Sequence, residues 1–224
     1  MLARVTARAP IPPYRRNCGP SGGHSSDTSA PAPFLHPGQP ATVYPANREI
    51  FAQGEKVSAI YQVAFGAIRI YRLLADGRRQ ISAFHFSGEM FGLESGDRHE
   101  FFAEAITNAG IRIIRPSANG GFADHLLPIA LQGLARAQRH LLLLGRQTAL
   151  EKLAAFLTDM AERQGDGDHV DLPMQRGDIG DYLGLTLETV SRIFSKLKEA
   201  GIIRMRTARS IEIVEMAALK AMSE

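Results

Sequence analysis

The stretch QRGDIGDYLGLTLETVSRIFSKLKEAGIIR, residues Gln175–Arg204, decides the fold of the C-terminal part of the chain. In its second half, apolar residues recur at i, i+3, i+4 and i+7, the spacing of a helix that packs on a core. These residues are Val190, Ile193, Phe194 and Leu197. The opposite face carries polar side chains that can bond to base edges or phosphates. The stretch therefore predicts a helix over Thr186–Ala200 whose outer face serves recognition.

Local signals place the start of this helix and a partner helix before it. Thr186 stands at the N-cap position, and Glu188 in the first turn suits the helix dipole. The preceding segment Asp178–Leu183 supplies apolar residues to the same small core, and Gly184–Leu185 forms a tight turn between the two. This order is that of a helix-turn-helix. The alternative is an ordinary helical hairpin with a solvated face, which periodicity alone does not distinguish.

The residues that follow predict a β-hairpin. Ala200–Gly201 is a helix stop, and Ile202–Met205 and Ser210–Val214 are strand-like runs around a turn at Thr207–Arg209. Such a hairpin is a wing. Over the whole region basic residues outnumber acidic ones, which favours contact with phosphates. The basic residues are Arg176, Arg192, Lys196, Lys198, Arg204, Arg206 and Arg209, and the acidic ones are Asp178, Asp181, Glu188 and Glu199.

The run GDIGDYLGLTLETVSR, residues Gly177–Arg192, closely resembles the helix-turn-helix of CRP/FNR-type transcription regulators, most of all that of the FNR and FixK branch. The chain from about Ala41 agrees with that family in the order and kind of its segments. In FNR-like proteins the Glu-x-x-Ser-Arg of the recognition helix reads the TTG part of a TTG…CAA palindrome. The resemblance implies these base readers: Leu187, Glu188, Ser191 and Arg192.

The chemistry of these side chains fits the same DNA target. Arg192 can donate two hydrogen bonds to guanine O6 and N7, and Glu188 can accept one from cytosine N4. Leu187 is suited to contact a thymine methyl group. We expect phosphate contacts from a second set of residues: Arg176, Thr186, Thr189, Ser195, Lys196 and Arg206.

Length and composition favour a two-domain protein. The 224 residues exceed a typical single domain, and 45% hydrophobic content suffices for cores. No run approaches the roughly 18 apolar residues of a membrane-spanning helix, and the N-terminus lacks a signal-peptide core, so we expect a cytoplasmic protein without a membrane partner. The net charge of +3 is compatible with nucleic acid but does not indicate it.

Residues 1–40 differ in kind from the rest. They are rich in Ala, Pro, Gly and Ser and show no periodicity, so we expect a flexible arm, of which Phe34–Leu35 can still pack on the body. The chain's single cysteine, Cys18, lies there, and an incidental thiol is its simplest interpretation. One cysteine cannot hold the four-thiolate iron–sulfur cluster of FNR.

From about Val43 to Pro116, short apolar runs alternate with turn signals and predict a small antiparallel β structure. The expected strands are Ile60–Val63, Gly66–Leu74, Gln80–Phe86 and Ile111–Ile114, with a hairpin signal at Asp76–Gly77. The strings FAQGE (Phe51–Glu55) and GEMFGLESG (Gly88–Gly96) resemble landmarks of the cyclic-nucleotide-binding β-roll of the CRP/FNR family. That resemblance implies a fold and not a ligand.

The residues after the Gly-Glu pair argue against a cyclic-nucleotide ligand. In cAMP-binding relatives an Arg-Ser pair there holds the cyclic phosphate. The matching residues are His99–Glu100, whose carboxylate would repel a phosphate, although Arg98 lies next to them. The seven histidines show no metal-binding spacing, so we predict no metal and no cofactor. The alternative is haem on His85 or His99, as in relatives that sense nitric oxide or carbon monoxide.

The longest helical signal runs from about His125 to Arg163, as a stripe of leucines and other apolar residues that Gly145 weakens in the middle. In the CRP/FNR family this region gives a long dimerisation helix and a shorter return helix, and LGRQTALEKLAAFL (Leu144–Leu157) resembles its sequence. A helix in an intramolecular core is the alternative. The expected dimerisation residues are Leu134, Leu141 and Leu144.

The expected fold is α+β, with an N-terminal cyclic-nucleotide-binding-like β-roll, a long dimerisation helix and a C-terminal winged helix-turn-helix. The expected segments are the arm (1–40), the β-roll (41–124), the dimerisation helix and hinge (125–164) and the DNA-binding domain (165–224).

The resemblance implies a homodimeric, FixK-like activator that binds double-stranded DNA at a TTG…CAA palindrome and contacts RNA polymerase. It further implies control of genes for low-oxygen respiration or nitrogen fixation. An enzyme is not expected, because phosphate loops, nucleophile elbows and paired acids are absent from the sequence. The rival functions are a regulator gated by haem or cyclic nucleotide, and an interaction module whose helical hairpin never touches DNA.

Overall fold

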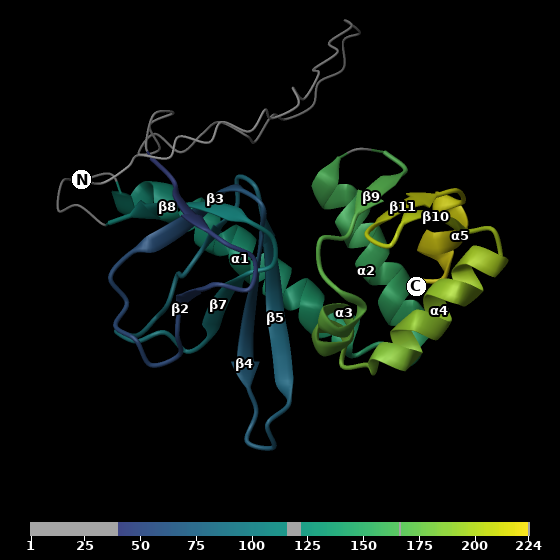
Figure 1. Cartoon of the computed structure of the whole chain (residues 1–224), viewed down its shortest axis with the longest axis horizontal. Helices are drawn as coiled ribbons and strands as arrows, with labels where there is room; N and C mark the ends of the chain where they lie inside the picture. Colours follow the sequence, from purple (N-terminus) through teal and green to yellow (C-terminus); the bar gives the residue numbers. More distant parts are fainter. Residues whose placement is uncertain (1–39, 116–121, 166, 224) are drawn as a thin grey trace, which may run out of the picture. The chain divides into compact units, whose positions relative to one another are not determined.

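The computed structural model describes residues 40–115, 122–165 and 167–223. Its N-terminal part is built of short strands, and its C-terminal part of helices with one small sheet (Figure 1). The predictions on the N-terminal arm, including Cys18 and Phe34–Leu35, lie outside the described residues. Among the helices that the structure describes, none has the length and apolar character needed to cross a membrane.

The N-terminal strands form two antiparallel sheets of four strands each. The order in the first sheet is β1 (Thr42–Tyr44), β8 (Ala109–Ile114), β3 (Ile60–Phe65) and β6 (Met90–Phe91). The order in the second is β2 (Glu49–Phe51), β7 (Phe102–Ala105), β4 (Ala67–Leu73) and β5 (Arg79–Phe86). Apolar side chains from both sheets, among them Val63, Ile68 and Ile111, are fully buried in a shared core. This is the predicted β-roll.

The four predicted strands correspond to β3, β4, β5 and β8, with ends that differ by at most two residues. The hairpin signal at Asp76–Gly77 is confirmed, because these residues join β4 to β5, and Gly77 has the positive φ of 83° that such a turn requires. The sequence did not reveal β1, β2, β6 and β7, which have only two to four residues each.

The long apolar stripe forms two helices, α1 (Phe122–Leu144) and α2 (Ala149–Gln164). A capping box starts α2: Thr148 Oγ1 accepts from the Glu151 backbone N–H at 3.1 Å, and the Glu151 carboxylate accepts from the Thr148 N–H at 3.4 Å. The weakness expected at Gly145 is therefore a complete break. It divides a long helix from a shorter one, as the family resemblance implied.

The C-terminal elements are a helix-turn-helix, a three-stranded sheet and a short last helix. The predicted helices are α3 (Arg176–Leu183) and α4 (Leu187–Glu199), and the predicted wing is β10 (Ile203–Thr207) with β11 (Ser210–Ile213). The sequence did not reveal β9 (His169–Asp171), which pairs with β11, or α5 (Met216–Ala221).

Helix α2 shares the core of these C-terminal elements. Its Leu153, Phe156 and Met160 are fully buried in one cluster with Ile179 and Val190 of the helix-turn-helix. We therefore propose the break after Leu144, rather than residue 165, as the start of the C-terminal domain.

The turn between α3 and α4 depends on a close backbone approach at Gly180. The Leu185 N–H donates to the Gly180 carbonyl at 2.9 Å, and a Cβ on Gly180 would lie only 2.6 Å from the Leu185 carbonyl oxygen. Gly184 then ends α3 in the left-handed conformation, with φ of 65°. The two glycines bring α3 and α4 into the geometry of the motif.

We expect Gly180→Ala to lower the free energy of unfolding by roughly 1–3 kcal/mol, because the new methyl group collides with backbone rather than with a movable side chain. Gly177→Ala is the matched control. A Cβ there meets nothing within 4 Å, so alanine should be neutral or add up to about 1 kcal/mol of helix stability. Urea denaturation followed by circular dichroism measures both. Equal stabilities of the two variants would contradict the steric argument.

Candidate DNA-binding interface

Helix α4 buries one face and exposes the other. Val190, Ile193, Phe194 and Leu197 are buried, as the periodicity predicted. The expected base readers Leu187, Glu188, Ser191 and Arg192 are all exposed, together with Ser195 and Lys196. An apolar side chain such as Leu187, with 49% of its surface exposed at the first position of the helix, has no packing reason to be there. The structure thus brings the predicted readers together on one open surface.

The N-cap of α4 is linked to one of the base readers. The Thr186 hydroxyl accepts from the Thr189 N–H at 3.2 Å, which confirms Thr186 as the cap. The hydroxyls of Thr186 and Thr189 share a hydrogen bond of 3.1 Å, and Arg192 Nη2 donates to Thr189 Oγ1 at 3.3 Å. These linked hydrogen bonds hold the guanidinium of Arg192 over the first turn of the helix, where the base-reading residues of such helices lie.

The surroundings of Glu188 keep its carboxylate ionised, which makes it a hydrogen-bond acceptor. The backbone N–H of Glu188 and the Thr186 hydroxyl lower the pKa of its carboxyl group, and Arg192 adds to the effect. The side chain is therefore an anion at neutral pH. An ionised carboxylate has only acceptor sites, which suits an amino group such as cytosine N4.

The residues expected to bind phosphates lie in different surroundings. Lys196 and Ser195 are exposed, and Ser195 Oγ donates to the Ser191 carbonyl at 3.2 Å. Arg206 forms an ion pair with Glu212 at 2.5 Å, and Glu212 also pairs with Arg204 at 3.2 Å, so one carboxylate holds two arginines of the wing. Glu212 therefore competes with a DNA phosphate for these two exposed arginines.

Arg176 is packed against the protein itself. Its guanidinium carbon lies 3.1 Å from the centroid of the Phe194 ring, and burial lowers its pKa to about 10. The side chain would have to leave this ring to reach a phosphate. Its expected phosphate contact stays a prediction, and the structure gives Arg176 a role in joining α3 to α4.

Helix α1 exposes a row of leucines. Leu134 and Leu141 have 55% and 70% of their surface exposed, and Leu127 and Leu131 are similarly open. Together with Gln138 these residues alternate in steps of four and three, the repeat of a coiled-coil seam. Leu144, the third predicted dimerisation residue, is half-buried and lies close to Gly184 at the turn before α4.

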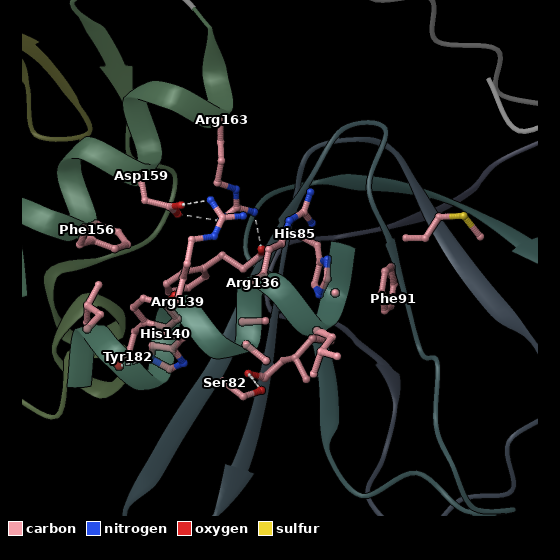
Figure 2. Close-up of a pocket in the computed structure, with 18 of the residues that line it drawn as sticks. Ser82, His85, Phe91, Arg136, Arg139, His140, Phe156, Asp159, Arg163 and Tyr182 are labelled. Atoms are coloured by element: carbon pink, nitrogen blue, oxygen red, sulfur yellow. Dashed lines mark hydrogen bonds and ion pairs between the residues drawn. The ribbon is translucent and has the colours of Figure 1, made fainter. Parts of the chain in front are cut away.

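A cavity of about 700 Å³ lies among β5, α1 and α2. Figure 2 shows Arg139, Asp159 and Arg163 on one side of it and His85 and Phe91 on the other. Asp159 pairs with Arg163 at 3.5 Å and lies 3.8 Å from Arg139. The charged groups at its rim are therefore largely paired with one another.

Glu89, of the Gly-Glu pair in the β-roll, joins three parts of the chain. Its carboxylate lies 3.1 Å from Arg136 of α1 and 2.9 Å from Arg163 of α2, and it accepts from the Phe86 N–H at 3.1 Å. Burial raises the pKa of Glu89, but neighbouring His85, Arg163 and Arg136 outweigh burial and lower it to about 2. Burial also lowers the pKa of His85.

In the segment that binds the phosphate in cAMP-binding relatives, His99 is buried in the core here, whereas Glu100 is exposed. The ring of His99 stacks on Phe51 at 3.7 Å with an angle of 11°, and its Nδ1 lies 3.3 Å from Glu94 Oε1. Arg98, the cation beside it, donates to the Gly54 carbonyl at 2.7 Å. Across the described ranges no group of three or more His, Cys, Asp and Glu side chains could hold a metal ion.

A capped helix with an open reading face, a preceding helix locked to it by a glycine turn, and a basic wing define a DNA-binding regulator of the winged helix-turn-helix class. Residues 151–222 match the Crp-like helix-turn-helix domain family, and residues 41–116 match the cyclic nucleotide-binding domain family. The chain belongs to the CRP/FNR family of transcription regulators, on its FixK-like branch.

The individual relatives agree with this assignment. The nitrogen fixation regulation protein FixK of Rhizobium meliloti is 54% identical, over 86% of this chain and 90% of the relative. The protein of the same description from Azorhizobium caulinodans is 38% identical, over 98% and 94%. The solved structure of FixK2 from Bradyrhizobium japonicum has a TM-score of 0.77 and 43% identity, and the match covers 82% of this chain and 98% of that one.

The role of Glu89 can be tested through the pH dependence of stability. Because its pKa is lowered from 4.5 to about 2, the ionised carboxylate contributes on the order of 3 kcal/mol above pH 4.5, which is lost as the pH falls towards 2. Glu89→Gln should therefore be less stable than the native chain at pH 7, and the difference should shrink between pH 4.5 and 3. Urea denaturation at these pH values measures it.

Glu100→Gln is the control for this measurement, since Glu100 is an exposed carboxylate. Its stability should follow that of the native chain at every pH. A Glu89→Gln deficit that stays constant down to pH 3 would show that the ion pairs with Arg136 and Arg163 do not stabilise the fold.

Proposed function

We propose that this protein is a homodimeric transcription activator that reads a TTG…CAA palindrome with α4 and contacts RNA polymerase. The observation that carries the proposal is the open face of α4, where Glu188, Ser191 and Arg192 stand at the spacing of the FNR-type reading residues. The proposed target genes, for low-oxygen respiration or nitrogen fixation, rest on relatives described as nitrogen fixation regulation proteins.

The leucine seam of α1 supports the proposed dimer. A row of exposed leucines over four turns is costly in water, and a second copy of the same seam would bury it. A two-fold dimer also matches a two-fold operator, because two reading helices about 34 Å apart enter successive major grooves. A dimer formed through the leucine seam of α1 would therefore have the two-fold symmetry that a palindromic operator needs.

Internal contacts support activity without a ligand. Two charged groups near the expected ligand position in the β-roll already have partners within the protein: Glu89 pairs with Arg136 and Arg163, and Arg98 donates to the Gly54 carbonyl. His99, at the position of the phosphate-binding arginine in cAMP-binding relatives, stacks within the aromatic core. We propose that the β-roll acts as a scaffold whose arrangement needs no cyclic nucleotide.

The cavity beside β5 favours a second candidate function, a regulator gated by haem or cyclic nucleotide. Its volume of about 700 Å³ falls within the range of small-molecule sites. Such a regulator would need its ligand for selective DNA binding, and the ligand would raise the unfolding temperature.

Fluorescence anisotropy tests both candidates. The purified protein is titrated onto a TTG-N8-CAA duplex and a scrambled duplex at one stated salt concentration, alone, with cAMP and with haemin. Selective binding by the protein alone supports the proposal. Selectivity that appears only with cAMP or haemin would establish the second candidate, and none under any condition would refute both.

Two substitutions on α4 separate base reading from phosphate binding. Arg192→Ala should cost about 1–3 kcal/mol on the palindrome and little on scrambled DNA, because only the palindrome presents the guanine. Lys196→Ala should weaken binding to both DNAs and flatten the salt dependence. Equal losses of Arg192→Ala on the two duplexes would exclude a base-reading role for that residue.

A charge in the leucine seam should prevent dimerisation. Leu134→Glu places two carboxylates against each other at the centre of the proposed interface, so the mass in solution should fall from about twice 24.4 kDa to 24.4 kDa. Sedimentation equilibrium measures the mass. Gln132→Glu, an exposed position of α1 outside the seam, should leave the mass unchanged. A dimeric Leu134→Glu variant would place the interface elsewhere.

A further inference from the structure

Helix α3, the first helix of the helix-turn-helix, is held by charged side chains of the β4–β5 hairpin. Arg79 of β5 contacts both acids of α3: its Nη2 lies 2.5 Å from Asp178, and its Nε donates to Asp181 at 2.9 Å. Arg69 of β4 donates to the other oxygen of Asp178 at 3.1 Å. The carboxylate of Asp178 is thus bound on both sides by arginines that precede it by about a hundred residues.

Because these charged groups are buried, each of them needs a partner of opposite charge. The Asp178 side chain is 4% exposed, and Arg69 is 11% exposed and also pairs with Glu104 at 2.5 Å. Removing one partner of a buried charge leaves the other without compensation, at a large cost in free energy. The orientation of α3 against the hairpin is therefore strongly specified, since in other orientations these buried charges would lose their partners.

Neutral contacts add to the attachment. Gln80 Nε2 donates to the backbone carbonyl of Asp181 at 2.7 Å. The ring of His140, from α1, lies parallel to the ring of Tyr182 at 3.9 Å, and its Nε2 bonds to the Tyr182 carbonyl at 2.8 Å. Because a carbonyl oxygen can only accept, this nitrogen carries the proton.

The attachment of α3 sets the direction of α4. The two helices pack through Ile179, Leu183 and Val190 of one core, and the backbone approach at Gly180 fixes the turn between them. A change in how α3 is held on the hairpin must therefore move the reading face of α4 with it.

We propose that Arg79 and Arg69 are positioning residues for DNA recognition, which fix the direction of the reading helix and so determine the half-site spacing that the dimer accepts. The inference rests on the proposed function, a dimer on a palindrome. Each added base pair moves a half-site by roughly 3.4 Å and turns it by roughly 35° about the DNA axis. Rigidly held helices reject such a shift, whereas loosely held helices follow it.

Arg79→Met is the test variant, because it removes the charge and keeps an apolar side chain of similar length. Arg78→Met is the matched control. Arg78 immediately precedes Arg79, its side chain is 77% exposed, and it pairs with Asp76 of the same turn. Affinities are measured by anisotropy at one salt concentration on TTG-N8-CAA, on palindromes with spacers one and two base pairs shorter or longer, and on scrambled DNA.

We expect the native protein and Arg78→Met to prefer the eight-base spacer on the order of tenfold over its neighbours, and this preference to fall by roughly threefold in Arg79→Met. Discrimination against a mutated TTG half-site should stay unchanged, because the readers on α4 are untouched. A merely structural role for Arg79 would lower all affinities together and would leave the spacer preference as it is.

Circular dichroism confirms that each variant is folded before these measurements. If Arg79→Met does not fold, Asp181→Ala breaks the more exposed of the two contacts and takes its place, with the same expected loss of spacer preference. A folded variant with the native spacer preference would overturn the positioning role while the proposed function stands. Failure of the native protein to select any palindrome would instead overturn the proposed function, and this inference with it.

Discussion

The buried carboxylate of Asp178 is the constraint on which the arrangement of the described residues depends. A charge that is only 4% exposed needs partners on every side, and Asp178 finds them in Arg69, Arg79 and the Gln175 N–H at 3.4 Å. The first two belong to the β-roll and the last to the start of α3. The same group therefore caps the first helix of the DNA-binding motif and ties that helix to the sheet behind it.

A second set of internal ion pairs supports the proposal that the β-roll serves without a ligand. Glu89 joins the β-roll to α1 and α2 through Arg136 and Arg163. A bound molecule that links a sheet to a dimerisation helix supplies the same kind of bridge. Here covalently attached side chains supply such a bridge, and under the proposed ligand-free function its formation would not depend on the concentration of a small molecule.

Regular periodicity made much of the fold predictable. The recognition helix α4 follows from its apolar spacing, its cap at Thr186 from the residue type before the first turn, and the strands β3, β4, β5 and β8 from apolar runs between turn signals. The strand β9 has a single buried residue, Val170, and so leaves no period to detect. The pairing of Arg69 with Asp178 joins residues 109 apart, which no local pattern encodes. The packing of Arg176 on the Phe194 ring was not predictable either, because the sequence shows the charge of Arg176 and not the ring beneath it.

The single carboxylate of Glu212, which holds both Arg204 and Arg206, affects how the wing meets DNA. If these arginines meet phosphates in the proposed complex, each gains only the difference between a phosphate and the carboxylate that it gives up. Both arginines are more than half exposed, so solvent screens their pairs with Glu212 and this reduction is modest. Under the proposed function, the wing would then add somewhat less to binding at incorrect sites than its count of cations suggests, and more of the protein would stay available to search for its operators.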